Sequence, residues 1–359
     1  VTYVMAIMSL QRYYDKLNGS RALVTGGTGQ VGRRLVTALV KCGVKVSVMT
    51  RSPQSGSKIF NGLPLEFRQG DVTEPANLTR VLNGIDIVFH LASFSGDSTR
   101  KINLYENSEH WKVTALGTEN MVKAVLVSSC RSLVYFSSVK AMGEEAGALG
   151  YPDTETAASK PETLYGQAKL AAEKAIISAG SHSQLSTTIL RLPMVYGLEG
   201  AGNLGSMIDA VARRHFPPFP KISNRRSAVH ADDAIQAALR AATNPRACGS
   251  LYIVTDGKGY STRWIYEQIC LGLGRDIPKW TLPFWCWKLA AELGSLAERR
   301  FRIHSPLTSD SLRKLFGDAW FSSNRIEQEL GFKPQFALGS EIETLAKSYL
   351  EKHRADPNV

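Results

Sequence analysis

The sequence predicts an α/β fold in which a doubly wound parallel sheet carries a smaller mixed C-terminal domain. Short apolar runs typical of buried parallel strands alternate with helix-prone segments, which predicts strands joined by right-handed crossovers. The first apolar run also ends in a glycine-rich turn that opens a helix, within Ala22 to Gly32. A chain of 359 residues is long enough for such a sheet and a second domain.

The glycine-rich turn has the features of a dinucleotide-binding loop. One glycine lets the chain turn off the strand, one lets the backbone approach a pyrophosphate, and one lets the helix pack close to the strand. The phosphates then meet the positive end of the new helix. A turn that binds nothing is the alternative. The sequence therefore predicts a Rossmann-type cofactor loop formed by Gly26, Thr28, Gly29, Gln30, Val31 and Gly32.

The residue after the second strand indicates which cofactor fits. In NAD-binding versions of this fold, an acidic residue about 20 positions past the glycines accepts hydrogen bonds from the ribose 2′-hydroxyl. Here Arg51 stands at that place, 51 − 32 = 19 residues beyond Gly32. A guanidinium pairs with phosphate through two parallel hydrogen bonds, so the sequence favours NADP(H). NAD(H) stays open, because Arg51 could also be a solvated surface residue.

Later strands end in residues that would line the same edge of the sheet. The strand within 65–72 closes on Asp71 and Val72, and the strand within 85–92 closes on Leu91 and Ala92. Cofactors bind outside the carboxyl ends of parallel strands, so these residues are expected near the cofactor. His90 ends an apolar run, and we expect a packed, hydrogen-bonded histidine there rather than a catalyst.

A tyrosine and a lysine follow the strand 132–138, which ends in two serines. Tyr165 and Lys169 are 169 − 165 = 4 residues apart, which places them on one face of a helix. Free tyrosine has a pKa near 10, and a neighbouring cation lowers it by favouring the phenolate. We therefore expect Tyr165 to donate a proton to a carbonyl oxygen as hydride reaches the carbon.

These motifs resemble the extended short-chain dehydrogenase/reductase superfamily, and within it the NAD-dependent epimerase/dehydratase family. The marks that carry the resemblance span about residues 21–352: Thr25 to Gly32, Gly70-Asp71-Val72, His90-Leu91-Ala92, Phe136-Ser137-Ser138, Tyr165 with Lys169, and Arg191 to Gly197. The resemblance implies that Tyr165 is the acid/base, that Lys169 holds the nicotinamide ribose and tunes Tyr165, and that Ser138 binds the substrate oxygen. It also implies cofactor contacts from Asp71 and Val72 to the adenine, and further ones from Leu91, Ala92 and Pro193.

The substrate is suggested by two further stretches. Residues 137–144 and 224–233 are similar to nucleotide-sugar enzymes, namely UDP-glucose-type 4-epimerases and 4-reductases of UDP-linked 4-keto-6-deoxy-N-acetylhexosamines. The resemblance implies that Arg226 grips the diphosphate, and that Asn203 and Lys140 contact the substrate. We therefore expect an NADP(H)-dependent oxidoreductase acting at C4 of a UDP-sugar, most simply by 4-keto reduction. Thr114 and Met194 depart from the asparagines that relatives often carry.

Three other functions stay open. They are an NAD-dependent UDP-sugar 4-epimerase, an enzyme like a 3β-hydroxysteroid dehydrogenase, and a nucleotide-sensing protein without catalysis. A nucleic-acid partner is not expected, because the basic residues behind the formal charge of +11 are scattered, apart from Arg299, Arg300 and Arg302. The sequence contains no zinc-binding spacing, so no metal site is expected. A homodimer stays open.

Domain organisation and location complete the expectations. Residues 1–20 lack a secretory pattern and are expected to be an extension outside the fold. The cofactor domain is expected at 21–190, regaining 226–256, and the substrate region at 191–352, mainly 191–225 and 257–352. Five dispersed cysteines suggest reduced thiols in a cytoplasmic protein. The apolar segment Pro283 to Leu293 favours core or subunit packing over a helix on a membrane surface, so peripheral membrane contact stays open.

Overall fold

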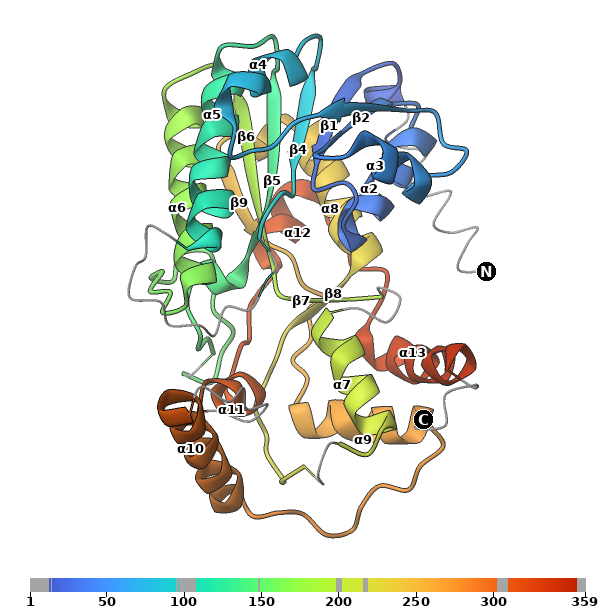
Figure 1. Ribbon diagram of the computed structural model, residues 1–359, viewed down its shortest axis with the longest axis vertical. Coiled ribbons are helices and arrows are strands. Elements are labelled where there is room, and N and C mark those ends of the chain that lie inside the picture. Colours follow the sequence, from blue (N-terminus) through green and yellow to red (C-terminus); the bar gives the residue numbers. More distant parts are fainter. Residues whose placement is uncertain are drawn as a thin grey trace.

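A computed structural model of the chain describes residues 13, 15–94, 96, 108–147, 149–197, 202–215, 219–301 and 309–353. Most of the expected N-terminal extension, residues 1–12 and 14, lies outside these described residues, and so does Arg302. The centre of the molecule is a seven-stranded sheet in the order β3-β2-β1-β4-β5-β6-β9 (Figure 1). All its neighbouring strands pair in parallel, which confirms the predicted fold.

The strand bounds follow the apolar runs of the sequence. The sheet contains β1 (Arg21–Thr25), β2 (Lys45–Thr50), β3 (Leu65–Gln69), β4 (Ile87–His90), β5 (Ser132–Ser138), β6 (Ser186–Leu192) and β9 (Ser250–Ile253). Two short strands, β7 (Met194–Tyr196) and β8 (Ala228–His230), form a separate parallel pair below it in Figure 1.

Helices and helical turns connect the strands. The helices are α2 (Gln30–Lys41), α3 (Pro53–Ile59), α4 (Leu78–Val81), α5 (Gly117–Leu126), α6 (Leu164–Ser181), α7 (Gly202–Ala212), α8 (Ala231–Thr243), α9 (Thr262–Gly272), α10 (Phe284–Phe301), α11 (Ser309–Phe316), α12 (Asn324–Leu330) and α13 (Leu338–Lys352). The short helical segments are η1 (Pro75–Asn77), η3 (His110–Leu116), η4 (Val139–Ala141) and η5 (Pro245–Ala247).

Helices cover both faces of the sheet because its strands are apolar on both sides. On β1, Leu23 belongs to the core formed with α4, α5 and α6, whereas Val24 belongs to the core formed with α2, α8 and α12. Neighbouring residues of a strand point to opposite faces, so one continuous apolar run serves both cores. Figure 1 shows α5 and α6 on one side of the sheet, and α2 and α8 on the other.

A third core holds the C-terminal part together. It joins α7, α9, α10, α11 and α13 around buried aromatic side chains such as Phe219, Tyr266 and Trp287. Backbone hydrogen bonds tie this part to the segment that follows β5: the Ala146 N–H donates to the Asp318 carbonyl (3.2 Å), and the Ser322 N–H donates to the Asp153 carbonyl (2.9 Å). The C-terminal part is therefore fixed beside the carboxyl end of β5, where Ser138 lies.

The helix that precedes β5 does not begin as an α-helix. Its first turns, η3, are a π-helix that runs directly into α5. Thr114 lies in this segment, where its hydroxyl accepts from the Phe94 N–H (3.2 Å) and lies 3.1 Å from the Ser93 hydroxyl. Thr114 thus anchors the loop after β4 to the helix, and π-helical turns of this kind are frequent at functional sites.

The apolar segment Pro283 to Leu293 becomes the first half of α10, and its expected burial is only half right. Trp287 and Ala291 are buried against the third core, but Trp285, Leu289 and Leu293 are more than half exposed. The helical period separates these residues onto two faces, which a count of apolar residues does not show. Among the helices of the described segments, none is long and apolar enough to cross a membrane.

Candidate active site

Two positions of the glycine loop accept no residue other than glycine. Gly26 has φ of +67°, and a Cβ atom there would lie 2.8 Å from the carbonyl carbon of Leu91. A Cβ atom on Gly32 would lie 2.3 Å from the Gly26 carbonyl oxygen. In this part of the structure no side chain caps α2, whose N-cap is Gly29, and its first turn contains no acidic residue. The N–H groups of α2 are therefore suited to an anionic group, and the loop fits a dinucleotide pyrophosphate.

The residues expected near the adenosine end lie after β2 and β3. Arg51 is exposed directly after β2. One carboxylate oxygen of Asp71 accepts from the Thr73 N–H (2.9 Å) and the Thr73 hydroxyl (2.8 Å). The Val72 carbonyl accepts from the Asn120 amide (3.0 Å), so Asp71 and Val72 are held between β3 and α5.

A second cation beside the glycine loop was not predicted. The Arg33 guanidinium is exposed and donates to the Thr28 carbonyl (2.8 Å), directly on the loop. The only signal in the sequence was its position next to Gly32.

Leu91 and Ala92 are fixed by a buried hydrogen-bond chain. Their N–H groups donate to the Thr25 hydroxyl (3.2 and 3.1 Å), which is also hydrogen-bonded to His90 Nδ1 (2.7 Å). His90 Nε2 lies 3.0 Å from the Thr118 hydroxyl. Burial lowers the pKa of His90 to about 3, so the ring is neutral at pH 7. The expectation of a packed, hydrogen-bonded His90 is confirmed, and this histidine joins the end of β1 to α5.

The three residues expected to be catalytic come together at the end of β5. Ser138 ends that strand, and its hydroxyl is hydrogen-bonded to Tyr165 in the first turn of α6. Lys169 follows one turn later and is buried, and its Nζ donates to the Phe136 carbonyl (2.8 Å). Nζ lies 5.9 Å from the centre of the Tyr165 ring. The arrangement places a hydroxyl donor, a phenol and an ammonium group within one small region.

The pKa of Tyr165 differs from the direction expected from the sequence. Burial raises it above the ordinary tyrosine value, and the hydrogen bond with Ser138 opposes this only in part. Lys169 is not among the groups that lower it: its Nζ lies 5.9 Å from the centre of the Tyr165 ring and donates to the Phe136 carbonyl. Burial also lowers the pKa of Lys169 to about 7, although the charge of Glu173 opposes that change. Tyr165 is therefore a protonated phenol at pH 7.

Behind these residues lies a buried ion pair that was not predicted. Glu173 continues the α6 face that carries Tyr165 and Lys169, and it binds Arg191 of β6 through two contacts (2.7 and 3.0 Å). The Ser137 hydroxyl also donates to Glu173 (2.5 Å). The two side chains of the pair are 5% and 1% exposed. The spacing of four from Lys169 to Glu173 was the signal available in the sequence.

Lys140 joins a polar chain that leads from Ser138 to α6. Its backbone N–H donates to the Ser138 hydroxyl (3.2 Å), and its ammonium group pairs with Glu144, whose side chain is 3% exposed. Glu144 also accepts from the Thr163 hydroxyl (2.9 Å), and Thr163 caps the N-terminus of α6 by accepting from the Gly166 N–H. This chain determines the position of the helical turn that carries Tyr165.

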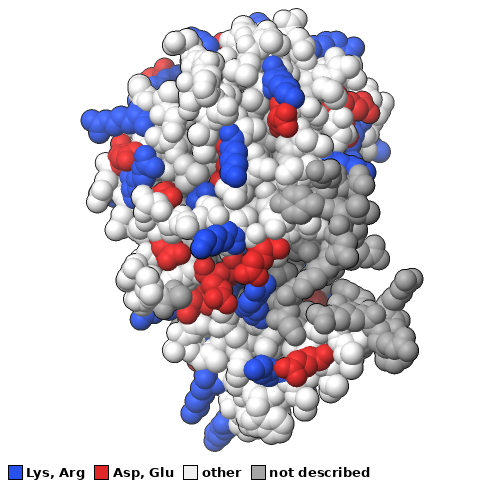
Figure 2. Space-filling view, turned by 90° about the vertical axis from the view of Figure 1, so that its left-hand side faces the viewer, with Lys and Arg blue, Asp and Glu red and all other residues white. Residues whose placement is uncertain are grey.

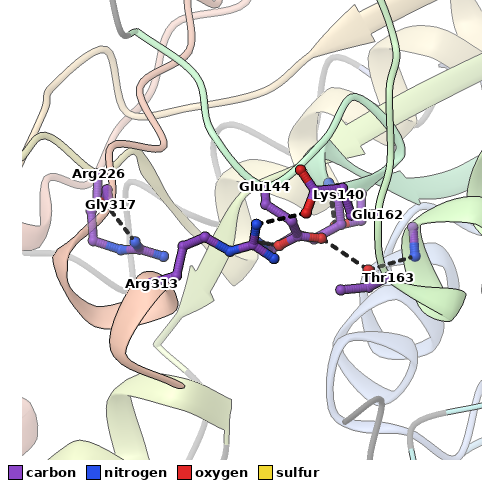
Figure 3. Close-up of polar contacts among 9 residues, drawn as sticks. Lys140, Glu144, Glu162, Thr163, Arg226, Arg313 and Gly317 are labelled. Carbon is purple, nitrogen blue, oxygen red and sulfur yellow. Dashed lines mark hydrogen bonds and ion pairs between the residues drawn. The ribbon is translucent and has the colours of Figure 1, made fainter. Parts of the chain in front are cut away.

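Two arginines from the C-terminal part lie next to this chain. Arg226 donates to the Gly317 carbonyl (3.1 Å), and Arg313 of α11 donates to Glu162 (2.6 Å). Figure 3 shows Arg313 between Arg226 on one side and Glu144 and Thr163 on the other. Burial lowers the pKa of Arg226, which nevertheless remains a cation at pH 7. Arg313 was not predicted, because only the fold brings residue 313 next to residue 162.

The remaining predicted residues lie at the border of the two parts. Pro193 stands between β6 and β7, partly exposed. Asn203 is exposed in the first turn of α7, and no hydrogen bond found in the described part of the chain joins it to the Arg226 group. Over the same residues, no three His, Cys, Asp or Glu side chains gather in a way that could hold a metal ion.

Comparison with known proteins agrees with this geometry. The model of the NAD dependent epimerase/dehydratase family matches residues 22–254. The chain is 26% identical to a UDP-glucose 4-epimerase of Vibrio cholerae, over 94% of this chain and 98% of that protein. It is 24% identical to a 3 beta-hydroxysteroid dehydrogenase/Delta 5-->4-isomerase of Mycobacterium tuberculosis, over 88% of this chain and 86% of that protein.

A solved structure has the same fold. MoeE5, in complex with UDP-glucuronic acid and NAD, superposes with a TM-score of 0.71 over 94% of this chain and all of that chain. The two sequences are 21% identical, so the likeness concerns the fold alone.

Proposed function

Since the chain belongs to the NAD dependent epimerase/dehydratase family, we propose that it reduces the 4-keto group of a UDP-linked sugar with NADPH. It is an NAD(P)-dependent enzyme of the extended short-chain dehydrogenase type. One observation carries the finer proposal: a continuous set of polar contacts runs from Ser138 through Lys140 and Glu144 to Thr163, beside which Arg313 and Arg226 lie. One substrate could therefore place its carbonyl group at Ser138 and its anionic group at Arg226 and Arg313.

The loop residues and the strand ends would hold the cofactor. The pyrophosphate would lie on Gly26, Gly29 and the start of α2, and Arg51 would bind the 2′-phosphate. When bound, NADPH supplies the hydride that the carbonyl carbon receives. The other residues proposed as cofactor contacts are Thr28, Gln30, Val31, Gly32, Asp71, Val72, Leu91, Ala92, Lys169 and Pro193.

Tyr165 would provide the proton. The phenol is protonated at pH 7, as a group that donates to a carbonyl oxygen must be, although burial raises its pKa and so makes it a weaker acid. Ser138 would hold the same oxygen by a hydrogen bond, and Lys169 would hold the ribose from its buried position. In this step the O–H bond of Tyr165 breaks and a hydroxyl group forms on the sugar, so the phenol must regain a proton before the next turnover.

The two arginines support a diphosphate rather than a neutral substrate. Guanidinium groups bind phosphate oxygens through paired N–H donors, and such donors are most valuable in a partly buried site. Arg226 is partly buried, and the Arg313 side chain is 35% exposed. We assign Arg226 and Arg313 to the diphosphate, and Lys140 and Asn203 to the remainder of the substrate.

A 4-epimerase is the second candidate, because the Vibrio cholerae relative with that name aligns over nearly the whole chain. An epimerase returns the hydride to the same sugar and retains its cofactor, whereas a reductase consumes added NADPH. The Mycobacterium tuberculosis relative makes a steroid dehydrogenase a third candidate, but a steroid carries no diphosphate for Arg226 and Arg313 to bind. A nucleotide-sensing protein without catalysis would have no use for Ser138, Tyr165 and Lys169 gathered at the end of β5.

A panel of UDP-sugars and UDP-4-keto sugars, with NADPH oxidation followed by absorbance, tests the proposal. We expect oxidation with a keto sugar and not with a steroid ketone. Tyr165→Phe should keep cofactor affinity and lose most turnover, because proton donation acts in the transition state. Oxidation of NADPH by the steroid alone, or full turnover by Tyr165→Phe, would refute the substrate class or the mechanism respectively.

The domain bounds, location and assembly remain proposals as well. We propose a cofactor domain at 21–190 with 226–256, a substrate region over the rest of 191–352, and a cytoplasmic location; a homodimer stays open. The five cysteines, all free thiols in the structure, support a reducing compartment.

A further inference from the structure

Helix α10 has two apolar faces, and the protein covers one of them. On the inner face Trp287 and Ala291 are 4% and 1% exposed. The Trp287 ring packs against Phe219 and Phe316, with ring centres 5.5 and 5.6 Å apart, and Phe284 packs against Phe316 at 5.1 Å. These contacts fix the rotation of α10 about its axis, so its other face points away from the core.

The outer face of α10 is a stripe of large apolar side chains. It consists of Trp285, Leu289, Leu293 and Leu296, which are 66%, 51%, 58% and 58% exposed. Their spacing of i, i+4, i+8 and i+11 aligns them along one side of the helix, over about 16 Å at 1.5 Å per residue. Single exposed apolar residues are ordinary on a protein surface, but an aligned stripe indicates an interaction site.

The surroundings of the stripe are basic. Trp280, just before α10, is 62% exposed, and Lys279 and Lys288 are exposed. Among the described residues from 279 to 296, the exposed charged side chains are two lysines, Lys279 and Lys288, and one acidic residue, Glu292. Figure 1 shows α10 at the outer corner of the C-terminal part. In Figure 2, which faces that side, the lower end is mainly uncharged, with Lys or Arg side chains at its rim and one acidic group beside a basic one.

We propose that the outer face of α10 binds the surface of a membrane containing anionic phospholipids. A helix with an apolar stripe and basic residues lies in the plane of the interface, where its apolar side chains enter the region below the headgroups. Tryptophan is enriched at this depth, which suits Trp285 and the neighbouring Trp280. Lys279 and Lys288 then face anionic headgroups, and this attraction weakens as salt is added.

A second copy of this chain is the competing occupant of the stripe. Two copies would bring together the basic surroundings of two helices, in chains whose formal charge is +11 each. Like charges at an interface disfavour association, whereas an anionic surface complements them. The charge therefore favours a membrane over self-association. The proposal does not depend on the substrate, because none of the stripe residues belongs to the site around Tyr165.

Sedimentation of the full chain with lipid vesicles tests the proposal. We expect binding to vesicles of phosphatidylglycerol and phosphatidylcholine in equal parts, little binding to phosphatidylcholine alone, and release by high salt. The triple variant Leu289→Gln, Leu293→Gln, Leu296→Gln should bind at least roughly tenfold more weakly, because it removes most of the inserted apolar surface. Trp285→Phe should keep the binding and reduce the blue shift of tryptophan fluorescence, with the remainder coming from Trp280.

The controls separate lipid binding from misfolding and from self-association. Leu126→Gln changes a leucine of similar exposure, 44%, on α5 and should bind vesicles like the wild type. The triple variant should retain its circular dichroism spectrum and NADPH affinity, because the stripe touches neither core nor cofactor. The proposal is overturned if the wild type does not bind anionic vesicles, or if the triple variant binds them equally well. It is also overturned if the triple variant loses a dimer seen by size-exclusion chromatography while vesicle binding is absent.

Discussion

Thr163 donates a 2.9 Å hydrogen bond to the buried carboxylate of Glu144 while its oxygen accepts from the Gly166 N–H at the start of α6. The Thr163 hydroxyl donates its only proton to Glu144, and its oxygen lone pairs remain available to accept from the backbone N–H of Gly166. Glu144 also pairs with Lys140, so one threonine connects the segment after Ser138 to the turn that carries Tyr165.

Removing the Thr163 hydroxyl should therefore weaken both the helix and the site. We expect Thr163→Val to lower the free energy of unfolding by about 2–3 kcal/mol, since it removes an N-cap and a hydrogen bond to a carboxylate. Thr163→Ser keeps both and should change it by less than about 0.5 kcal/mol. Urea unfolding of the three proteins measures this. Equal stability of the valine and serine variants would show that the cap contributes nothing.

Breaking the buried Glu173–Arg191 ion pair should lower the free energy of unfolding more than the Thr163 substitution does. Glu173→Gln leaves the Arg191 guanidinium buried without its counter-charge, which costs about 3–5 kcal/mol of unfolding free energy. As a matched control, Glu119→Gln breaks the exposed pair with Lys123 on α5, and that change should cost less than about 1 kcal/mol. The two losses can be compared by urea unfolding, and similar values would mean that burial of the inner pair is unimportant.

The lowered pKa of His90 leads us to expect that the free energy of unfolding depends on pH. Its folded pKa, about 3, lies below the unfolded value of 6.5, so between these values the unfolded chain binds more protons. Stability from this group is complete above pH 6.5 and falls as the pH drops toward 3, by at most about 1.4 kcal/mol per pH unit. In His90→Gln this contribution should vanish. Unfolding free energies at pH 5 and pH 8 would show it, and an unchanged difference between the two pH values would contradict a neutral buried His90.

Arg51 predicts the cofactor preference. Arg51→Asp removes a cation and places an anion near the 2′-phosphate of NADPH, while it offers the 2′-hydroxyl of NADH an acceptor. A charge-assisted contact contributes about 1.5–3 kcal/mol, so the preference for NADPH over NADH should fall at least roughly tenfold. Binding titrations of both cofactors measure the ratio. Arg80→Asp changes an exposed arginine on α4 and should leave the ratio unchanged. If Arg51→Asp also leaves it unchanged, Arg51 does not bind the phosphate.

Features that depend on the spacing of nearby residues could be predicted from the sequence. Contacts between residues far apart in the chain, and the burial of each side chain, are known only from the fold. The glycine loop, the parallel sheet and the meeting of Ser138 with Tyr165 follow from strands that end at a common edge. The ion pair of Arg313 with Glu162 joins residues 151 apart, which no spacing rule connects. The pKa of Tyr165 was expected to fall because only Lys169 was considered; its burial, set by tertiary packing, raises it. For α10, only the third core shows which apolar face is covered.

Transfer of deuterium tests the central claim most directly. The enzyme would be given NADPH carrying deuterium at the transferred position and a UDP-4-keto-6-deoxy-N-acetylhexosamine, and the product would be examined by NMR and mass spectrometry. Transfer of the cofactor's hydride to the carbon of a carbonyl that Ser138 holds and Tyr165 protonates predicts one deuterium at C4 of a single epimer, and almost none with Tyr165→Phe. Absence of deuterated product and of NADPH oxidation with the keto sugar, together with interconversion of a UDP-sugar and its C4 epimer without added cofactor, would contradict reduction and identify an epimerase.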